Sequence, residues 1–233
     1  MKNNTLNPIS ISKLTWRLIG LFGLTLFTCA SNLQAEDKTD GAWIARINVA
    51  LDQPGSTTLT TQFSGLSDSA DVSFGSGFMF GGSVGYAWDN GFLLEVDYNW
   101  KSGGADRAPD FLFGPNTDVE VSSVVIAPSL WYRLEIEEWP TLKPKLGLSY
   151  GWLQEVSFDA EAGGSEESFD GDGTAFSVMA GLDWNIQDNW ILGVELRYYD
   201  GGNIDAVSEV DPSRSVSFDY SGWNAGVSVG YKF

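Results

Sequence analysis

The last thirteen residues of the chain, 221–233, alternate between large apolar side chains and small or polar ones. One parity holds Trp223, Ala225, Val227, Val229, Tyr231 and Phe233, and the other holds Gly222, Asn224, Gly226, Ser228, Gly230 and Lys232. A period of two is typical of a β-strand whose faces meet different surroundings. The stretch predicts a strand between an apolar exterior and a crowded polar interior, although a last strand of a soluble sandwich would also fit.

Eight stretches of the chain show this alternation. They are 43–51, 78–88, 92–101, 123–134, 142–153, 175–186, 190–199 and 221–233. The links after the second, fourth and sixth stretches are short, whereas the other four links span roughly 19 to 26 residues. Short turns at one rim and long loops at the other predict an all-β fold, an eight-stranded antiparallel up-and-down barrel.

Aromatic residues on the apolar parity fall at two heights of such a barrel. Near the short turns lie Trp43, Trp88, Phe92, Tyr132, Trp184, Trp190 and Phe233, and near the long links lie Phe80, Trp100, Trp152, Phe176, Tyr198 and Trp223. Two aromatic belts around an aliphatic band predict a transmembrane barrel with its apolar parity facing lipid. A soluble lipocalin-like barrel, which would turn that parity inward, is the alternative.

The opposite parity carries charged residues that we expect in the lumen. They are Arg46, Glu95, Asp97, Lys101, Arg133, Lys143, Lys145, Asp183, Glu195, Arg197 and Lys232. An eight-stranded barrel is only wide enough for side chains to fill, and buried charges need partners. We therefore predict an ion-paired network that plugs the lumen, with an ion path as the alternative.

Acidic residues gather in the long links, in a chain whose formal net charge is −18. The third link holds seven carboxylates between Glu155 and Asp172, and the acids of the first link begin at Asp52. We expect a solvated anionic surface; binding of Ca²⁺ or Mg²⁺ beside lipopolysaccharide phosphates is the alternative. The run Asp170-Gly171-Asp172-Gly173 lacks the rest of a calcium loop, so no metal site is assigned.

Residues 1–35 have the layout of a secretory signal peptide: a basic start, an apolar run of 12 residues and a small residue, Ala35, at the expected cut. The run is too short for a transmembrane helix. Lipidation at Cys29 is a weaker alternative, because Thr28 stands where a smaller residue is expected. The domain boundaries are thus 1–35 for the leader and 36–233 for the barrel.

Missing residue types exclude several functions. The sequence contains no histidine, and its one cysteine, Cys29, lies in the leader. The mature chain therefore lacks the usual general base of hydrolases, a cysteine nucleophile and the commonest ligands of transition metals, and we expect no cofactor. A pI near 4.1 argues against nucleic-acid binding.

The terminal strand and two hairpin segments, 144–151 and 192–200, resemble the small eight-stranded outer-membrane barrels of bacteria, typified by the OmpA transmembrane domain and OmpX. The resemblance covers the mature chain. It implies location in the bacterial outer membrane, with outer-membrane lipid, lipopolysaccharide and the barrel assembly machinery as partners. It also implies that this machinery reads Val229, Tyr231 and Phe233 as an assembly signal.

These observations favour a non-enzymatic barrel with a plugged lumen, acidic surface loops and a structural or surface-interaction role. A narrow ion or small-solute channel is the alternative, and a membrane-lipid enzyme is a weaker one, because outer-membrane acyltransferases, deacylases, phospholipases and omptin proteases rely on histidine. The sequence does not identify a surface ligand.

Overall fold

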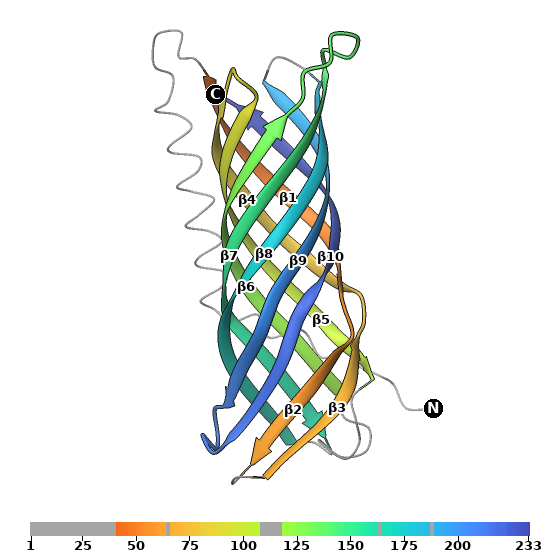
Figure 1. The fold of residues 1–233 in the computed structure, drawn as a ribbon, viewed down its shortest axis with the longest axis vertical. Coiled ribbons are helices and arrows are strands. Elements are labelled where there is room, and N and C mark those ends of the chain that lie inside the picture. The colour runs from red at the N-terminus through yellow and green to blue at the C-terminus, as the bar shows by residue number, and fades with distance from the viewer. Residues whose placement is uncertain (1–40, 64–65, 108–117, 163–164, 187–188) are drawn as a thin grey trace, which may run out of the picture. The chain divides into compact units, whose positions relative to one another are not determined.

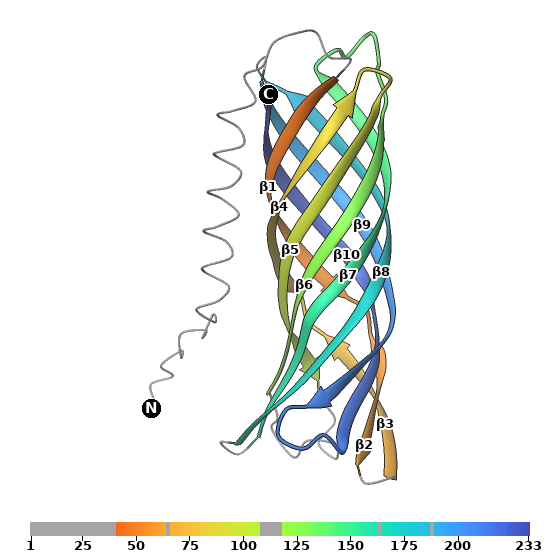
Figure 2. The same ribbon diagram turned by 90° about the vertical axis from the view of Figure 1, so that its left-hand side faces the viewer.

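The computed structural model describes residues 41–63, 66–107, 118–162, 165–186 and 189–233, and the regular elements among them are strands. The strands, drawn in Figures 1 and 2, are β1 (Gly41–Pro54), β2 (Thr57–Phe63), β3 (Leu66–Phe74), β4 (Gly77–Trp88), β5 (Phe92–Arg107), β6 (Asp118–Arg133), β7 (Leu142–Ala162), β8 (Ser165–Asn185), β9 (Trp190–Ser208) and β10 (Arg214–Lys232). Within these ranges no helix is long and apolar enough to cross a membrane.

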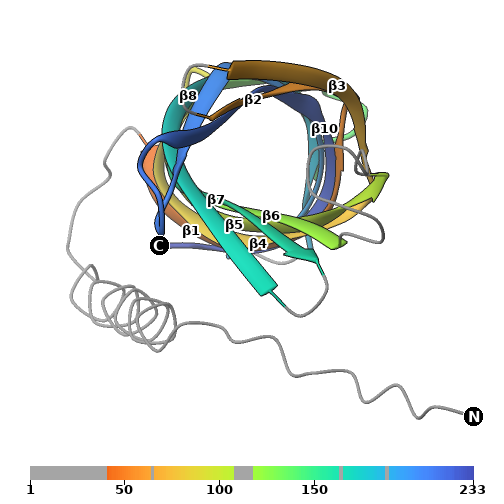
Figure 3. The ribbon, with the colours of Figure 1, turned by 90° about the horizontal axis from the view of Figure 1, so that it is seen from below.

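Eight strands close into the predicted ring. The order around the ring is β1, β4, β5, β6, β7, β8, β9 and β10, and pairing of β1 with β10 completes it. Every pairing is antiparallel, and the closing pair runs from Ile44 opposite Lys232 to Pro54 opposite Gly222. Figure 3 shows the ring end-on. Each of the eight strands contains one of the predicted stretches, so the predicted fold class is confirmed.

The hairpin of β2 and β3 occupies the first long link, where the sequence analysis expected a loop. It extends the wall beyond the ends of β1 and β4, because β2 pairs with β10 and β3 pairs with β5. The Gly55 N–H donates to the Ser221 carbonyl at 2.7 Å, and the Gly75 N–H donates to the Gly104 carbonyl at 2.8 Å. These bonds carry the sheet across the breaks between the hairpin and the longer strands.

The third long link is also strand rather than loop. β7 continues to Ala162 and β8 begins at Ser165, and the two are paired over this length. The extra length forms because apolar residues alternate with polar ones there: Val156 and Phe158 are fully buried. Glu155, with φ of 51°, lies at a register shift between Leu153 and Val156. This bulge moves the inward parity by one residue, so that Leu153 and Val156 both face the interior.

The wall of the barrel has two sections with opposite faces. We call the part between the two aromatic rows the belt section; in it, Ile47, Leu146 and Val194 point outward with exposures of 59%, 61% and 50%. Of the thirteen aromatic residues predicted for the belts, eleven are exposed, and Phe80 and Trp100 are half-buried. Charged and polar side chains fill the middle of this section, as the sequence predicted, and a buried apolar cluster lies inside its short-turn end.

Beyond the second aromatic row, in the part that we call the distal section, apolar side chains face inward. They form one buried cluster of Leu59, Val72, Phe74, Val119, Val121, Val125, Ala127, Leu153, Val156, Phe158, Ala160, Phe169, Ala175, Tyr199, Ile204, Ala206, Val216, Phe218 and Tyr220. Acidic side chains such as Asp170, Asp172 and Asp205 are exposed on the outside. The distal section is therefore built like a water-soluble barrel, whereas the belt section is built for an apolar surrounding.

Candidate functional site: the charged lumen and the acidic outer wall

The centre of the lumen holds a cluster of ion pairs around Arg46 of β1. The Arg46 Nε donates to Glu95 Oε1 at 2.8 Å, and its two terminal nitrogens donate to both oxygens of Asp183, at 3.1 and 2.7 Å. Lys145 Nζ lies 3.2 Å from Asp183 Oδ1. All four side chains are at least 96% buried, and each charge has a partner of opposite sign. We call these four residues the Arg46 cluster.

A second cluster surrounds Arg197 of β9. The Arg197 Nη2 lies 3.1 Å from Asp97 Oδ2 and 2.9 Å from Glu195 Oε1, and the Ser129 hydroxyl also donates to Asp97. Glu195 is less buried than its partners, with 28% of its side chain exposed. The one direct ionic contact between this Arg197 cluster and the Arg46 cluster joins Lys145 Nζ to Glu195 Oε2 at 3.9 Å.

A third ion pair lies at the boundary with the distal section. Lys101 Nζ is 3.2 Å from Asp52 Oδ1 and 3.5 Å from the centroid of the Tyr199 ring, and the Tyr199 hydroxyl donates to Asp52 at 3.1 Å. Asp52 is one of the surface acids that the sequence predicts for the first long link. That prediction is wrong, because β1 extends to Pro54 and its inward parity includes Asp52, which is 2% exposed.

Buried apolar side chains occupy the lumen on the short-turn side of the ion pairs. Lys145 Nζ lies 4.2 Å from the Trp131 ring centroid, and Trp131 is 1% exposed. It belongs to a cluster with Ile44, Ala87, Leu93, Met179 and Ile191. A Cβ at Gly147 would lie 2.6 Å from the Trp131 ring, so this glycine makes room for the indole. Ile44, Leu93 and Ile191 occupy inward positions of the alternation, so the sequence already carried a signal for this apolar cluster.

Three of the eleven predicted lumen residues lie outside the ion-pair clusters. Arg133 is half-buried and donates to the Trp88 carbonyl at 3.2 Å. Lys143 pairs with Glu135, which lies in the short link after β6. Lys232 is exposed at the end of β10, so its assignment to the lumen network is corrected. All three lie near the short-turn rim, where inward parity no longer ensures burial because solvent reaches the ends of the strands.

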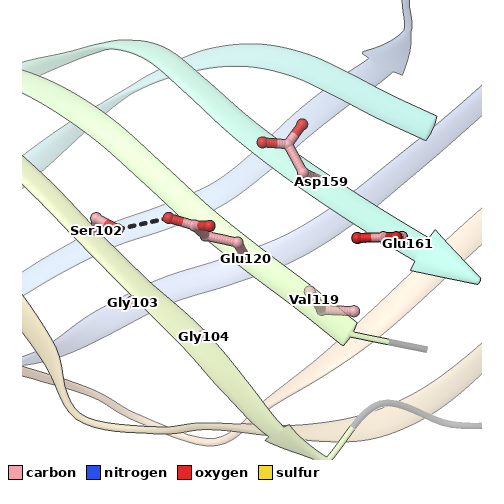
Figure 4. Close-up of a pocket in the computed structure, with 7 residues that line it drawn as sticks. All are labelled: Ser102, Gly103, Gly104, Val119, Glu120, Asp159 and Glu161. Carbon is pink, nitrogen blue, oxygen red and sulfur yellow. Dashed lines mark hydrogen bonds between the residues drawn. The ribbon is translucent and has the colours of Figure 1, made fainter. Parts of the chain in front are cut away.

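The outer wall carries an acidic groove just beyond the aromatic row, drawn in Figure 4. The groove holds about 330 Å³ and is lined by Ser102, Gly103, Gly104, Val119, Glu120, Asp159 and Glu161. Glu120 of β6 lies directly opposite Asp159 of β7, and the Ser102 hydroxyl donates to Glu120 at 2.8 Å. Like charges directly opposite in a sheet repel each other, so the groove concentrates negative potential on this face.

The described residues include no group of three or more carboxylate, cysteine or histidine side chains arranged to hold a metal ion. The run from Asp170 to Gly173 belongs to β8, where Asp170 and Asp172 face outward on the strand. A strand spreads alternate residues along one face, so it cannot wrap them around an ion as a calcium loop does.

The predicted assembly residues lie at the end of the strand that closes the ring. Val229 is 47% exposed on the outer face. The Tyr231 hydroxyl accepts a hydrogen bond from Asn189 at 3.0 Å, and its ring packs edge-on against Trp190. Phe233 follows β10 and is 38% exposed. The predicted leader, 1–35, lies outside the described residues.

Comparison with known proteins agrees with this architecture. The outer membrane protein OprG of Pseudomonas aeruginosa superposes with a TM-score of 0.65 at 16% sequence identity, covering 83% of this chain and 96% of OprG. The outer membrane protein AlkL superposes with a TM-score of 0.52 at 19% identity, covering 87% of this chain and 95% of AlkL. No curated protein matches the sequence at a significant level.

The two structural matches, at 16% and 19% sequence identity, show the fold alone, so the family is assigned from a family model. The model for the outer membrane protein beta-barrel domain matches residues 20–233. The small outer-membrane barrels to which the sequence is similar are thus confirmed as its relatives, and the bacterial outer membrane is its location. The chain belongs to the outer membrane protein β-barrel domain family.

Proposed function

We propose that the protein is a non-enzymatic barrel with a closed lumen that presents a rigid acidic surface outside the outer membrane. One observation carries the proposal: the ion pairs of the lumen lie between two buried apolar clusters, so charged and apolar layers follow each other along the interior. This order of layers opposes the passage of both ions and apolar solutes through the lumen.

Electrostatics supports the closed lumen. An ion that passed the centre would have to separate Arg46 from Glu95 or Asp183, and all three side chains are almost fully buried. Leaving one member of such a buried pair without its partner costs about 3 to 5 kcal/mol of free energy. A factor of ten in rate corresponds to about 1.4 kcal/mol, so passage would be slowed by orders of magnitude.

The distal section supports the surface role. Its inward side chains form a core of their own, and its acidic side chains point outward, so the strands hold these charges in fixed positions. We propose that the belt section contacts the acyl chains of outer-membrane lipid and that the acidic wall faces neighbouring lipopolysaccharide. Anionic phosphates and carboxylates would repel each other there unless divalent cations lay between them.

Single-channel recording in planar lipid bilayers tests the closed lumen. The wild-type barrel should give no steady current, whereas a porin measured in the same bilayers confirms the sensitivity. Replacing Arg46, Glu95, Lys145 and Asp183 together with Ser removes two charges of each sign and should raise the conductance. Heat-modifiable migration on electrophoresis checks that this variant is folded. Large, stable currents from the wild type would contradict the proposal.

The absence of enzymatic activity is a separate part of the proposal. The sequence has no histidine, and the Ser102 hydroxyl in the acidic groove is hydrogen-bonded to Glu120 rather than to a neutral base. Purified protein should therefore hydrolyse neither phospholipid esters nor peptides. Hydrolysis that disappears in the Ser102→Ala variant would contradict this.

A further inference from the structure

The exposed large apolar side chains of the distal section lie near its far end. Among the residues that the structure describes there, they are Phe63, Leu66, Val207 and Val210. Phe63 and Leu66 stand opposite each other where the hairpin of β2 and β3 turns, and they are 49% and 76% exposed. Val210 lies in the link before β10, the strand that pairs with β2, and is 80% exposed. We call Phe63 and Leu66 the hairpin tip; Figures 1 and 2 show this hairpin at the end of the barrel.

A neighbouring arginine fixes the position of the hairpin tip. Arg214 of β10 stands opposite Phe63, and its guanidinium carbon lies 5.7 Å from the centroid of the Phe63 ring. The same carbon lies 5.9 Å from the ring centroid of Phe169, which belongs to the buried distal cluster. Arg214 also forms an ion pair with Glu167. The exposed ring is thus tied to the distal core through Arg214 and presents a fixed apolar surface.

Acyl chains of the outer membrane do not reach the hairpin tip. Arg214, opposite Phe63, precedes Trp223 of the second aromatic row by nine residues along β10. At about 3.3 Å per residue, this separation is about 30 Å along the strand. Water therefore surrounds the tip, and the membrane does not account for its apolar side chains. An exposed apolar patch with a polar rim is typical of an interaction site.

The rim of the hairpin tip carries charge of one sign. Asp68 and Asp71 on β3 and Glu209 in the link before β10 are exposed. The ion pairs among the described side chains do not involve these three carboxylates. Arg214, the cation next to the tip, is already paired with Glu167. A molecule that covers the tip must therefore bring positive charge to its rim as well as apolar side chains to its centre.

We propose that the hairpin tip docks a basic amphipathic segment of another protein. Apolar side chains of the segment cover Phe63 and Leu66, and its lysine or arginine side chains contact the acids of the rim. A second copy of this chain would bring the same acids and be repelled, and lipopolysaccharide is anionic as well. The inference rests on the proposed surface role and names the class of partner that the acidic surface takes.

The test is fluorescence anisotropy of a labelled helical peptide that has leucine on one face and lysine on the other. The barrel is held in phosphatidylcholine nanodiscs, and empty nanodiscs give the blank. The wild type should bind this peptide, more weakly as NaCl is raised. The double variant Phe63→Ser with Leu66→Ser should bind about tenfold more weakly, because the centre of the interface is lost. Val207→Ser is the matched control, since Val207 is 43% exposed on the outer face of the same section, and it should bind as the wild type does.

Two comparison peptides separate the apolar and the charged contributions. Replacing lysine with glutamate in the peptide should abolish binding, and replacing leucine with serine should leave weak binding that the double variant does not change. Absence of binding above the blank, equal affinity of the wild type and the double variant, or equal affinity for the glutamate peptide would each overturn the inference. Heat-modifiable migration confirms that the variants are folded. Maleimide labelling of Asp68→Cys on intact cells, in a Cys29→Ser background, tests the surface role separately, and a protected Asp68→Cys would overturn both proposals.

Discussion

At the scale of single residues, each interior charge depends on a partner of opposite sign. Removal of one side chain would leave the other charge buried without compensation. Arg46 is held by two carboxylates, whereas Glu95 and Asp183 depend on Arg46 and Lys145 for compensation. A buried pair contributes little net stability over an apolar pair of the same shape, but a buried charge without its partner is strongly unfavourable. The network thus fixes which side chains can stand opposite one another across the lumen.

Replacing Glu95 with Ala should lower the free energy of unfolding by about 3 to 5 kcal/mol, because the Arg46 guanidinium then loses its partner on Nε. Glu195→Ala should have a smaller effect, because 28% of the Glu195 side chain is exposed, against 3% for Glu95; the arginine keeps a second carboxylate partner in both variants. Urea unfolding in lipid bilayers measures both, with the exposed Glu138→Ala as control. Equal stability of Glu95→Ala and Glu138→Ala would mean that the lumen is hydrated around Arg46.

Two carboxyl groups at opposite rims should titrate on opposite sides of their usual range. The hydrogen bond from Lys143, with its charge, lowers the pKa of Glu135, whereas a hydrogen bond with Asp170 raises the pKa of Glu209. The Glu135 pair therefore stabilises the fold above the unfolded pKa and loses this effect as the pH falls through the folded pKa. The raised pKa of Glu209 has the opposite pH dependence. Its contribution to the stability of the fold is present below the unfolded pKa and is lost as the pH rises through the folded pKa.

Carboxyl ¹³C titration by nuclear magnetic resonance measures both groups. The Lys143→Gln variant should return the pKa of Glu135 to the ordinary range and leave Glu209 unchanged. Identical titration of Glu135 in the wild type and in Lys143→Gln would show that the pair does not form in solution.

At the scale of elements, the alternation along the chain predicted the strands of the belt section but not the extensions beyond it. In the belt section the large apolar residues point outward, and the predicted strands all follow that rule. The distal strands follow the same period with the faces exchanged: Val216, Phe218 and Tyr220 are buried, and the acids between such residues face outward. Acid-rich segments were therefore interpreted as loops, although their apolar residues recur at every second position.

The candidate site was predictable to a similar extent. Inward parity gave seven of the fully buried charged residues, but the partners could not be predicted, because the stagger between strands decides which inward residues meet. Asp52 illustrates this, since it meets Lys101 from β5, and β4 lies between their strands. It lies one residue beyond the predicted stretch 43–51 and was therefore assigned to the first long link, whereas β1 continues to Pro54.

Replacing Phe158 with Ala should open a cavity in the distal core and lower the free energy of unfolding by about 3 to 5 kcal/mol. Phe158 is fully buried and packs against Phe169 and Phe218 at ring distances of 6.2 and 6.0 Å. Phe176→Ala is the matched control, because Phe176 lies on the outside and is 47% exposed. Limited proteolysis should cut the distal section of Phe158→Ala first. If the distal section of that variant resisted proteolysis as the wild type does, the idea that its own apolar core holds this section together would be contradicted.

Deleting Phe233 should impair assembly in cells more than it impairs refolding in detergent, because its proposed role is recognition by the assembly machinery. The heat-modifiable fraction in outer membranes measures the first, and the refolded fraction of purified protein measures the second. Lys232→Ala serves as the control, since Lys232 is the exposed neighbour on the polar parity. Normal insertion of the deletion variant would refute the assembly-signal proposal.

At the scale of the whole barrel, one continuous wall passes between two surroundings. The belt section exposes aliphatic and aromatic side chains and buries ions together with one apolar cluster at its short-turn end, whereas the distal section buries apolar side chains and exposes acids. Both faces of the wall change at the same height, near Lys101 and Tyr199 on the inside and the second aromatic row on the outside. A lipid layer around the belt section accounts for this reversal, because water on both sections would select one parity throughout.

Cysteine labelling along β8 tests this arrangement most directly. In a Cys29→Ser background, single cysteines replace buried Phe169, exposed Asp170 and Val178, which is 50% exposed on the outside of the belt section. A membrane-impermeant maleimide applied to intact cells should label Asp170→Cys and neither of the others. Val178→Cys should stay unlabelled although its side chain points outward, because lipid covers it. Labelling of Val178→Cys at the rate of Asp170→Cys, or protection of Asp170→Cys in intact cells, would contradict the account.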